Sequence, residues 1–391
     1  MSVDLNELKN KKIALVLSGG VVKAAAWHLG VTLALEELGF YLKNNKTSAQ
    51  DLNPRSLEIG TYVGSSAGAL ICIYLASGYT PQDVIQATIG IKGSKLRGIS
   101  YKEMFTIKRP ELRAPKGDLY HPLDGLPVFL KTLLKPVITL PGFFTTEGLR
   151  NYLVEHVIVK DSFEDFNSDL FIVATQLDHS RKVIFSKYNY PNPSHDSTSV
   201  YYTGTNVSYA AAATMSVPPF YCPYPIKNPQ TNGVDYYIDG EIRETLSTHV
   251  AEDNGCDVII SSWTHTPYHF HDEVGSLVNY GLPPIAIQSI YLMIQKKIIA
   301  SRAERAKAID IMDTVNDYMK MERFSQTHRR EIMAILQRKL NINPKVKLID
   351  IYPDHHDYKL FFANSFSLNP KVSTHAVESG YKRTMQILGQ K

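Results

Sequence analysis

Short apolar runs alternate with segments of helical period along the first two thirds of the chain. Ile13–Leu17 and Leu57–Val63 have the length and composition of buried strands. Apolar residues spaced three and four apart predict helices over Ala24–Leu38 and Ala67–Ala76. Further strands are predicted at Asp169–Thr175, Lys182–Ser186, Val234–Ile238 and Asp257–Ser261. Strands that alternate with helices in this way indicate an α/β sheet with helices on its faces.

Three other segments lack this alternation. Residues 95–145 contain many prolines and glycines and have no clean period, and Tyr188–Thr203 is typical of a loop. Residues 283–340 are almost continuously helical in character, and Met293–Leu340 holds 11 Lys/Arg against six Asp/Glu. We interpret this basic stretch as a solvated helical face, with a surface for anionic lipid as the alternative.

The chain is expected to divide into three parts. Residues 1–275 form the main α/β domain, and residues 276–345 form a basic helical appendage. Residues 346–391 return with a strand near Val346–Tyr352 and a helix near Val372–Leu388, which we expect to pack on the main domain.

Composition excludes several classes of protein. Of the 391 residues, 44% are hydrophobic and 20% charged, which is typical of a globular chain with a sizeable core. The 42 basic and 38 acidic residues give a net charge of +4, too small to indicate nucleic-acid binding. The three cysteines, Cys72, Cys222 and Cys256, fit neither a disulfide framework nor a zinc site. With no signal-peptide core and no run of about 18 apolar residues, we expect a cytoplasmic protein whose membrane contact is at most peripheral.

The segment GSSAG at Gly64–Gly68 matches the G-x-S-x-G pattern of a nucleophile elbow. It falls where a predicted strand ends and a helix of small residues begins. In such a turn the serine is held in a strained conformation, and flanking glycines let neighbouring backbone pass close. The spacing selects Ser66 as the candidate nucleophile rather than Ser65.

A second glycine turn, Ser18–Lys23 (SGGVVK), follows the first predicted strand. It has neither the G-x-G-x-x-G spacing of a dinucleotide site nor the G-x-x-x-x-G-K-[ST] spacing of a P-loop. An oxyanion hole beside a serine nucleophile remains as the functional interpretation.

A serine nucleophile needs a base, and the chain offers two kinds. Asp239-Gly240 follows an apolar stretch and places a carboxylate at a strand end. A Ser-His-Asp triad remains open as well, because His249, His265, His269 and His271 follow Asp239 in the order that α/β-hydrolases use. The last three lie in HTPYHFH, which has metal-like spacing but no acidic or cysteine partner, and is interpreted as a polar loop.

Taken together and in this order, the motifs resemble the patatin-like phospholipase family over about residues 12–262. The resemblance rests on four blocks: SGGVVK (Ser18–Lys23), GSSAG (Gly64–Gly68), VATQLDHSRKVIFS (Val173–Ser186), and AAATMSVPPF (Ala211–Phe220) leading to Asp239-Gly240.

The resemblance implies a three-layer α/β/α fold with a mostly parallel central sheet, plus the helical C-terminal region. It implies a Ser–Asp dyad in which Ser66 is the nucleophile and Asp239 is the base, without a catalytic histidine. The remaining implied site residues are Gly19, Gly20 and the N–H of Val21 in the oxyanion hole, with Gly64, Gly68, Lys23 and Gly240 in support. The implied activity is carboxylic ester hydrolysis of glycerolipids, with phospholipids or lysophospholipids as substrates and with no metal or other cofactor. The alternatives are a lipid transacylase, a lipid-binding module that keeps the fold without the chemistry, and the histidine-dependent hydrolase.

Two positions depart from the family pattern. Val21 stands where a third glycine is usual, and its N–H can serve as a donor with a negative φ, since a positive φ disfavours a β-branched residue. Glu241 follows Asp239-Gly240 where a glycine or alanine is usual, and a second carboxylate is expected to raise the pKa of Asp239.

The apolar segment 126–144 is a candidate acyl-chain groove, with plain core packing as the alternative. Its large side chains are Phe129, Leu133, Leu134, Phe143 and Phe144.

Overall fold

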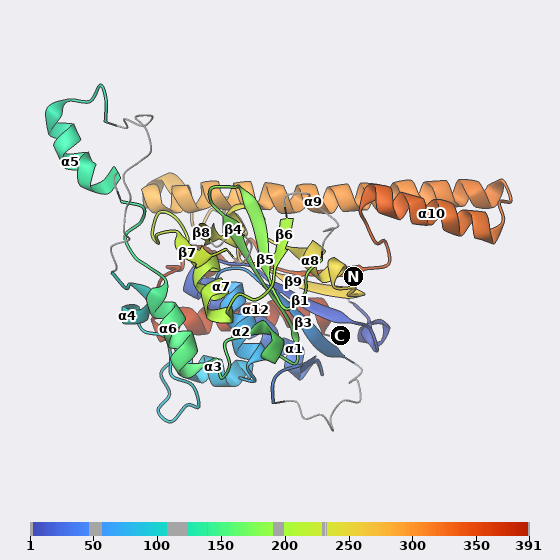
Figure 1. Cartoon of the computed structure of the whole chain (residues 1–391), viewed down its shortest axis with the longest axis horizontal. Coiled ribbons are helices and arrows are strands. Elements are labelled where there is room, and N and C mark those ends of the chain that lie inside the picture. The colour runs from blue at the N-terminus through green and yellow to red at the C-terminus, as the bar shows by residue number, and fades with distance from the viewer. Residues whose placement is uncertain are drawn as a thin grey trace.

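A mixed sheet forms the centre of the structure (Figure 1). The computed structural model describes residues 3–46, 57–107, 123–138, 140–190, 199–228, 231 and 233–389. The strands in these ranges are β1 (Ile13–Leu17), β2 (Tyr41–Leu42), β3 (Glu58–Gly64), β4 (Asp169–Gln176), β5 (Arg181–Phe185), β6 (Ser199–Tyr202), β7 (Tyr224–Lys227), β8 (Val234–Asp239), β9 (Val258–Ser262) and β10 (Lys347–Ile351).

The sheet is mostly parallel. Its strand order is β10-β9-β1-β3-β4-β5-β6, with β2 beside β3 and with β8 joining β4 to β7. The pairs β4–β5, β4–β8 and β7–β8 are antiparallel, and the other pairs are parallel. All five residues of β1 are buried, as expected of a central strand that is covered on both faces.

Helices cover both faces of the sheet. The α-helices are α1 (Val21–Glu37), α2 (Ala67–Ala76), α3 (Pro81–Thr88), α4 (Tyr101–Met104), α5 (Val128–Ile138), α6 (Glu147–His156), α7 (Val207–Thr214), α8 (Thr248–Asp253), α9 (Leu282–Met321), α10 (Gln326–Leu340), α11 (Tyr358–Phe362) and α12 (Pro370–Leu388). Short 3-10 turns are η1 (Leu5–Leu8), η3 (Phe163–Asp165), η4 (Gly240–Ile242) and η5 (Leu277–Tyr280).

The side chains of β1 alternate between the two cores. Leu15 and Leu17 pack in the larger core with α1, α2 and α12, while Ala14 and Val16 pack on the opposite face with α8 and with Ile298 of α9. The structure is therefore a three-layer α/β/α arrangement, as predicted.

Two glycines allow α12 to lie directly against α1. A Cβ on Gly30 would lie 1.9 Å from the Val377 carbonyl oxygen, and one on Gly380 would lie 2.3 Å from the Trp27 carbonyl oxygen. Since β10 also pairs with β9 in the same sheet, the end of the chain packs against the sheet and helices formed by its beginning.

The strands and helices predicted from apolar pattern agree with the structure to within three residues at each end. The interpretation of Tyr188–Thr203 as one loop is wrong at its end, because Ser199–Tyr202 form β6, which pairs with β5; residues 191–198 lie outside the described part. Within 95–145 the structure has α4 and α5, although residues 108–122 and 139 lie outside the described part.

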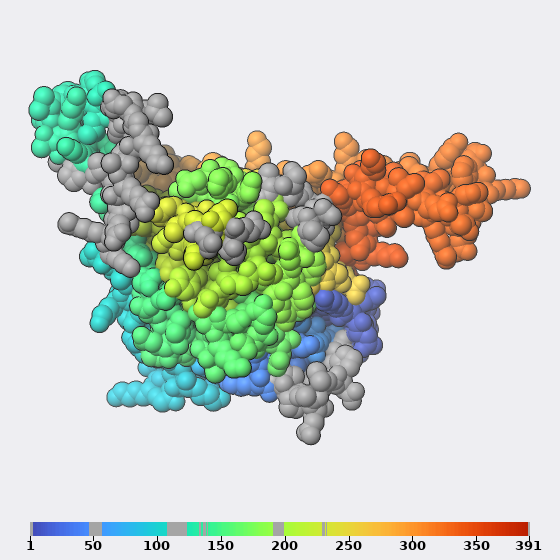
Figure 2. Space-filling view, viewed as in Figure 1, coloured from blue at the N-terminus to red at the C-terminus, as the bar shows by residue number. Residues whose placement is uncertain are grey.

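The basic stretch forms α9 and α10. Together with α5, the far end of this helical pair stands away from the body of the molecule (Figure 2). Among the described residues, no helix combines the length and the apolar character needed to span a bilayer.

Candidate active site

Ser66 occupies the sharp turn between β3 and α2. Its backbone has φ 50° and ψ −124°, a left-handed conformation that is strained for any residue other than glycine. A Cβ on Gly64 would lie 2.5 Å from Ala69 Cα, and one on Gly68 would lie 2.2 Å from the Leu17 carbonyl oxygen. The flanking glycines are therefore required by the close approach of backbone, as the elbow pattern predicts.

Sheet register brings Asp239 to Ser66. In the parallel pair β3–β4, Gly64 lies opposite Ile172, and in the antiparallel pair β4–β8, Asp239 lies opposite Ala174. Ser66 and Ala174 each follow these paired residues, Gly64 and Ile172, by two positions. Asp239, opposite Ala174, therefore lies at the same level of the sheet as the elbow. The Ser66 side chain lies beside the Asp239 carboxyl and lowers the pKa of that carboxyl.

The carboxyl of Asp239 is held in a buried and well-defined position. Its backbone N–H donates to the Ser216 carbonyl oxygen (3.0 Å), and its Oδ1 accepts from the Glu241 N–H (2.9 Å). A Cβ on Gly240 would lie 2.3 Å from the Val173 carbonyl oxygen, so only glycine fits after the aspartate.

Burial raises the pKa of Asp239 from 3.8 to about 6, while the hydrogen bonds from Ser66 and from the Glu241 N–H act in the opposite direction. The pKa of Asp239 is therefore raised, as predicted, but the cause is burial. The repulsion between the two carboxylates instead raises the pKa of Glu241.

The glycine loop lies beside Ser66. A Cβ on Gly19 would be 2.8 Å from Ser66 Cβ. In the described part of the chain, the N–H groups of Gly20 and Val21 have no protein acceptor. They lie at the start of α1, where the helix dipole adds partial positive charge, so they are suited to bind an oxyanion.

Val21 does not have the negative φ that was expected for it. Its φ is 59°, in the left-handed region, and Gly20 before it has φ 126°. The turn imposes this conformation on a β-branched residue although a third glycine would adopt it without strain. Nevertheless, the Val21 N–H donates no hydrogen bond within α1.

Lys23 is buried. Its Nζ donates to the carbonyl oxygens of Leu360 (3.2 Å) and Phe361 (3.4 Å) and lies 5.4 Å from the ring centroid of Tyr291. These contacts tie the start of α1 to α11 and α9, so the residue supports the loop from behind.

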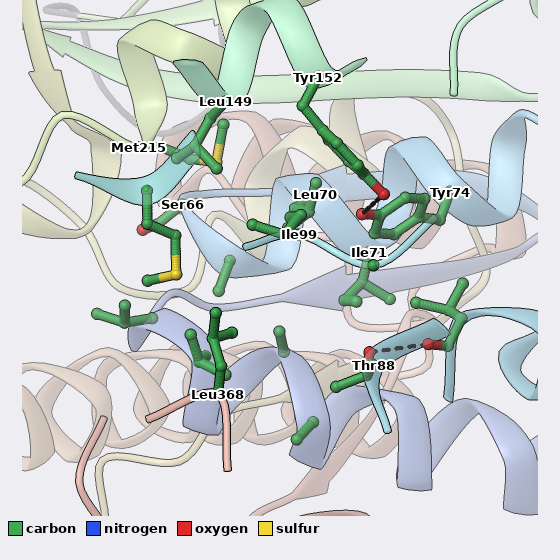
Figure 3. Close-up of a pocket in the computed structure, with 18 of the residues that line it drawn as sticks. Ser66, Leu70, Ile71, Tyr74, Thr88, Ile99, Leu149, Tyr152, Met215 and Leu368 are labelled. Atoms are coloured by element: carbon green, nitrogen blue, oxygen red, sulfur yellow. Dashed lines mark hydrogen bonds between the residues drawn. The ribbon is translucent and has the colours of Figure 1, made fainter. Parts of the chain in front are cut away.

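An apolar cavity extends from Ser66 between the helices on one face of the sheet (Figure 3). Ser66 lies toward one end, and the hydrogen-bonded hydroxyls of Tyr74 and Tyr152 (3.0 Å) lie toward the other. No described residue of its wall has a charged side chain. The apolar wall residues labelled in Figure 3 are Leu70, Ile71, Ile99, Leu149, Met215 and Leu368.

None of the described residues of segment 126–144 lines this cavity, so the cavity differs from the groove predicted there; residue 139 lies outside the described part. Phe129 is 69% exposed, and Phe143 is 48% exposed. Phe144 packs against Phe105, with 4.9 Å between ring centroids.

The four histidines considered for a triad have other surroundings. His249 Nδ1 lies 3.4 Å from Glu244 Oε1, and the rings of His269 and His271 lie against His355 and His356. His265 is close to the glycine loop, but burial and the nearby charge of Lys23 lower its pKa to about 3, which is poorly suited to a general base near neutral pH.

Among the described residues, one group has ligand atoms close enough to hold a metal ion. It consists of the exposed side chains of Asp354, His355 and His356, whose ligand atoms lie within 4.8 Å of one another. The group contains neither Ser66 nor Asp239.

Sequence reasoning did not assign a role to Thr214 or Ser216. The Thr214 hydroxyl accepts from the Ser66 N–H (2.9 Å) and donates to the Val173 carbonyl oxygen, so it fixes the elbow against β4. Both residues lie in AAATMSVPPF. The signal in the sequence was a threonine directly after a run of alanines.

Comparison with known families agrees with this geometry. A model of the family described as patatin-like phospholipase matches residues 15–252, which include the glycine loop, the elbow and Asp239. The comparison with curated proteins gave no match.

Proposed function

Because the chain belongs to the patatin-like phospholipase family, we propose that it is a serine lipid acyl hydrolase of phospholipase A or lysophospholipase type. The observation that carries the proposal is the position of Ser66 beside the buried carboxyl of Asp239, at one end of an apolar cavity. A nucleophile, a base and a site for an acyl chain are thus next to one another.

In the acylation step, Ser66 Oγ attacks the ester carbonyl carbon and its proton passes to the Asp239 carboxylate. The negative charge that forms on the carbonyl oxygen is stabilised by N–H groups of Gly19, Gly20 and Val21, an effect of about 3 kcal/mol per donor. The tetrahedral intermediate collapses, and the leaving alcohol takes the proton from Asp239. An acyl-Ser66 ester remains.

In the deacylation step, water attacks the acyl carbon and gives a proton to Asp239. The fatty acid leaves as Ser66 Oγ recovers that proton. Asp239 acts as a base in both steps, and a carboxyl with a pKa near 6 is a stronger base than an exposed aspartate while still ionised at neutral pH.

The cavity favours a lipid acyl chain. Among the described residues that line it none is charged, and the hydrogen-bonded Tyr74 and Tyr152 lie at its far end, so it suits a hydrocarbon chain and not a charged head group. The head group would therefore stay outside, toward solvent or membrane.

Peripheral contact with a membrane is part of the proposal. Helix α5 exposes Val128 and Phe129, at 79% and 69%, and carries Lys131 and Lys135. Apolar side chains beside lysines are typical of helices that bind an anionic lipid surface.

The test is ester hydrolysis by the purified protein on a short-chain chromogenic ester and on phospholipid vesicles, with a chelator present. Ser66→Ala and Asp239→Asn should lose turnover, whereas Ser77→Ala, at the other end of α2, should retain it. Turnover that survives Ser66→Ala would contradict the proposal. Vesicle binding without turnover in the wild type would favour the lipid-binding module, and acyl transfer to an added lysolipid would favour the transacylase.

A further inference from the structure

Glu241 is a carboxyl group beside the reacting atoms that the proposed reaction does not use. It lies in η4, directly after Asp239-Gly240, and its side chain turns toward the glycine loop. Its Cγ lies 2.7 Å from the position that a Cβ on Gly19 would take, and Ser66 Oγ lies 3.3 Å from the same position. Glu241 and Ser66 thus flank Gly19 together.

The Glu241 carboxyl binds two neighbouring groups. Its Oε1 accepts a short hydrogen bond from the Ser65 hydroxyl, and the carboxyl lies close to the Gly19 N–H, which lowers the pKa of that carboxyl. Solvent reaches part of the residue, but Oε2 is buried and has no hydrogen-bond partner of good geometry among the described residues. The Gly19 N–H, one of the proposed oxyanion donors, is therefore already in contact with a carboxyl group.

The surroundings of this carboxyl favour its neutral form. Burial and then the charge of Asp239 raise the pKa of Glu241 well above its ordinary value, while the bonds from Ser65 and Gly19 act in the opposite direction. Once Asp239 is ionised, a second buried negative charge next to it is unfavourable. The pair therefore favours a single negative charge, on Asp239.

The other charged groups near η4 do not offset this preference. Glu244 adds a further negative charge, and its own carboxylate forms an ion pair with Lys182. Two cations, Arg243 and Lys297, donate hydrogen bonds to backbone carbonyls.

We propose that Glu241 is a positioning residue of the oxyanion hole and that the enzyme turns over only while this carboxyl is neutral. This inference rests on the proposed function. A neutral carboxyl can release the Gly19 N–H to the oxyanion without charge repulsion. An ionised one would keep the N–H by a stronger, charge-assisted bond and would repel the negative charge that develops on the substrate oxygen.

The effect should appear in kcat and not in KM, because the oxyanion exists in the transition state and not in the bound ester. Above the pKa of Glu241, wild-type kcat should fall about tenfold per pH unit. The glutamine variant has the same shape and cannot ionise, so its kcat should stay level over the same range.

The experiment measures kcat and KM from about pH 5 to about pH 10 for the wild type, Glu241→Gln and Glu241→Ala, with a short-chain ester. Glu304→Gln, which removes an exposed carboxylate on α9, is the control for net charge and should keep the wild-type profile. Thermal unfolding checks that each variant is folded, and the alanine variant carries the test if the glutamine variant is not.

An alkaline fall that is lost in Glu241→Gln or Glu241→Ala, with KM unchanged, supports the inference. A fall of the same size in the wild type and both variants would overturn it, as would loss of kcat at every pH in a folded Glu241→Gln. These outcomes leave the proposed function standing as long as Ser66→Ala has no turnover. Turnover in Ser66→Ala would instead overturn the proposed function itself.

Discussion

Replacing Asp239 by asparagine should stabilise the folded protein at alkaline pH, although it removes the proposed base. Asp239 is 3% exposed, and burial raises its pKa from 3.8 to about 6. Its ionised form is therefore less favourable in the folded protein than in the unfolded chain. An asparagine can still accept the hydrogen bond from the Glu241 N–H, and it carries no charge to bury.

The magnitude follows from the linkage between proton binding and folding. Each tenfold change in acidity is equivalent to about 1.4 kcal/mol, so the rise from 3.8 to about 6 corresponds to about 3 kcal/mol. Below pH 3.8 the group is neutral in both states and imposes no penalty. Between pH 3.8 and about 6 the unfolded chain is ionised while the folded protein keeps the proton, so wild-type stability falls over this range and stays lower by this amount above it.

The assay is urea unfolding of the wild type and Asp239→Asn at about pH 4 and about pH 8. The variant should gain about 3 kcal/mol relative to the wild type between the two pH values. Asp178→Asn, which changes an exposed aspartate in the β4–β5 turn, should show no such gain. A difference between Asp239→Asn and the wild type that is equal at both pH values would refute the reasoning.

Three further changes test other parts of the site. Val21→Gly should be at least as stable as the wild type in urea, because it removes a β-branched residue from a left-handed backbone conformation. Val22→Gly, at an ordinary helical position, should lose about 1 kcal/mol or more of its free energy of unfolding. Equal losses in the two variants would argue against strain at Val21. Ala87→Phe should fill the cavity on α3 and reduce kcat/KM for long acyl chains at least tenfold more than for short ones; equal loss on both would exclude the cavity as the acyl site. Gly380→Ala should lower the free energy of unfolding by about 1–3 kcal/mol, since the new Cβ would lie 2.3 Å from a backbone oxygen of Trp27, and an unchanged unfolding curve would contradict that contact.

Local pattern was sufficient to predict the elements that form the centre of the fold. The run IALVL has the length of a strand and no polar residue, and it is β1 in the structure with all five residues buried. The G-x-S-x-G spacing selected Ser66 because the close approach of Gly64 and Gly68 to other backbone is a local consequence of a strand running into a helix. Such features depend on a few neighbouring residues.

The apolar cavity beside Ser66 could not be predicted in the same way. Segment 126–144 is rich in large apolar residues, but a cavity forms where facing side chains are too small to fill the space between helices. Ala25, Ala26, Ala67 and Ala87 come from three different helices and meet only in the folded chain. Likewise, Asp239 reaches Ser66 because β8 is antiparallel to β4, and the strand order that permits this is not visible in any one segment.

Three unfavourable local features meet at one place in the molecule. Ser66 and Val21 both have left-handed backbone conformations, and Asp239 is a buried carboxyl that ionises at the expense of stability. Each of these features destabilises the fold on its own, by an amount on the order of 1–3 kcal/mol. Structural need does not explain why they share one site, since glycine would relieve both turns and a neutral residue would relieve the burial. Strained backbone and buried charge cluster at active sites, so their coincidence at one end of an apolar cavity supports the proposed reaction independently of the family to which the chain belongs.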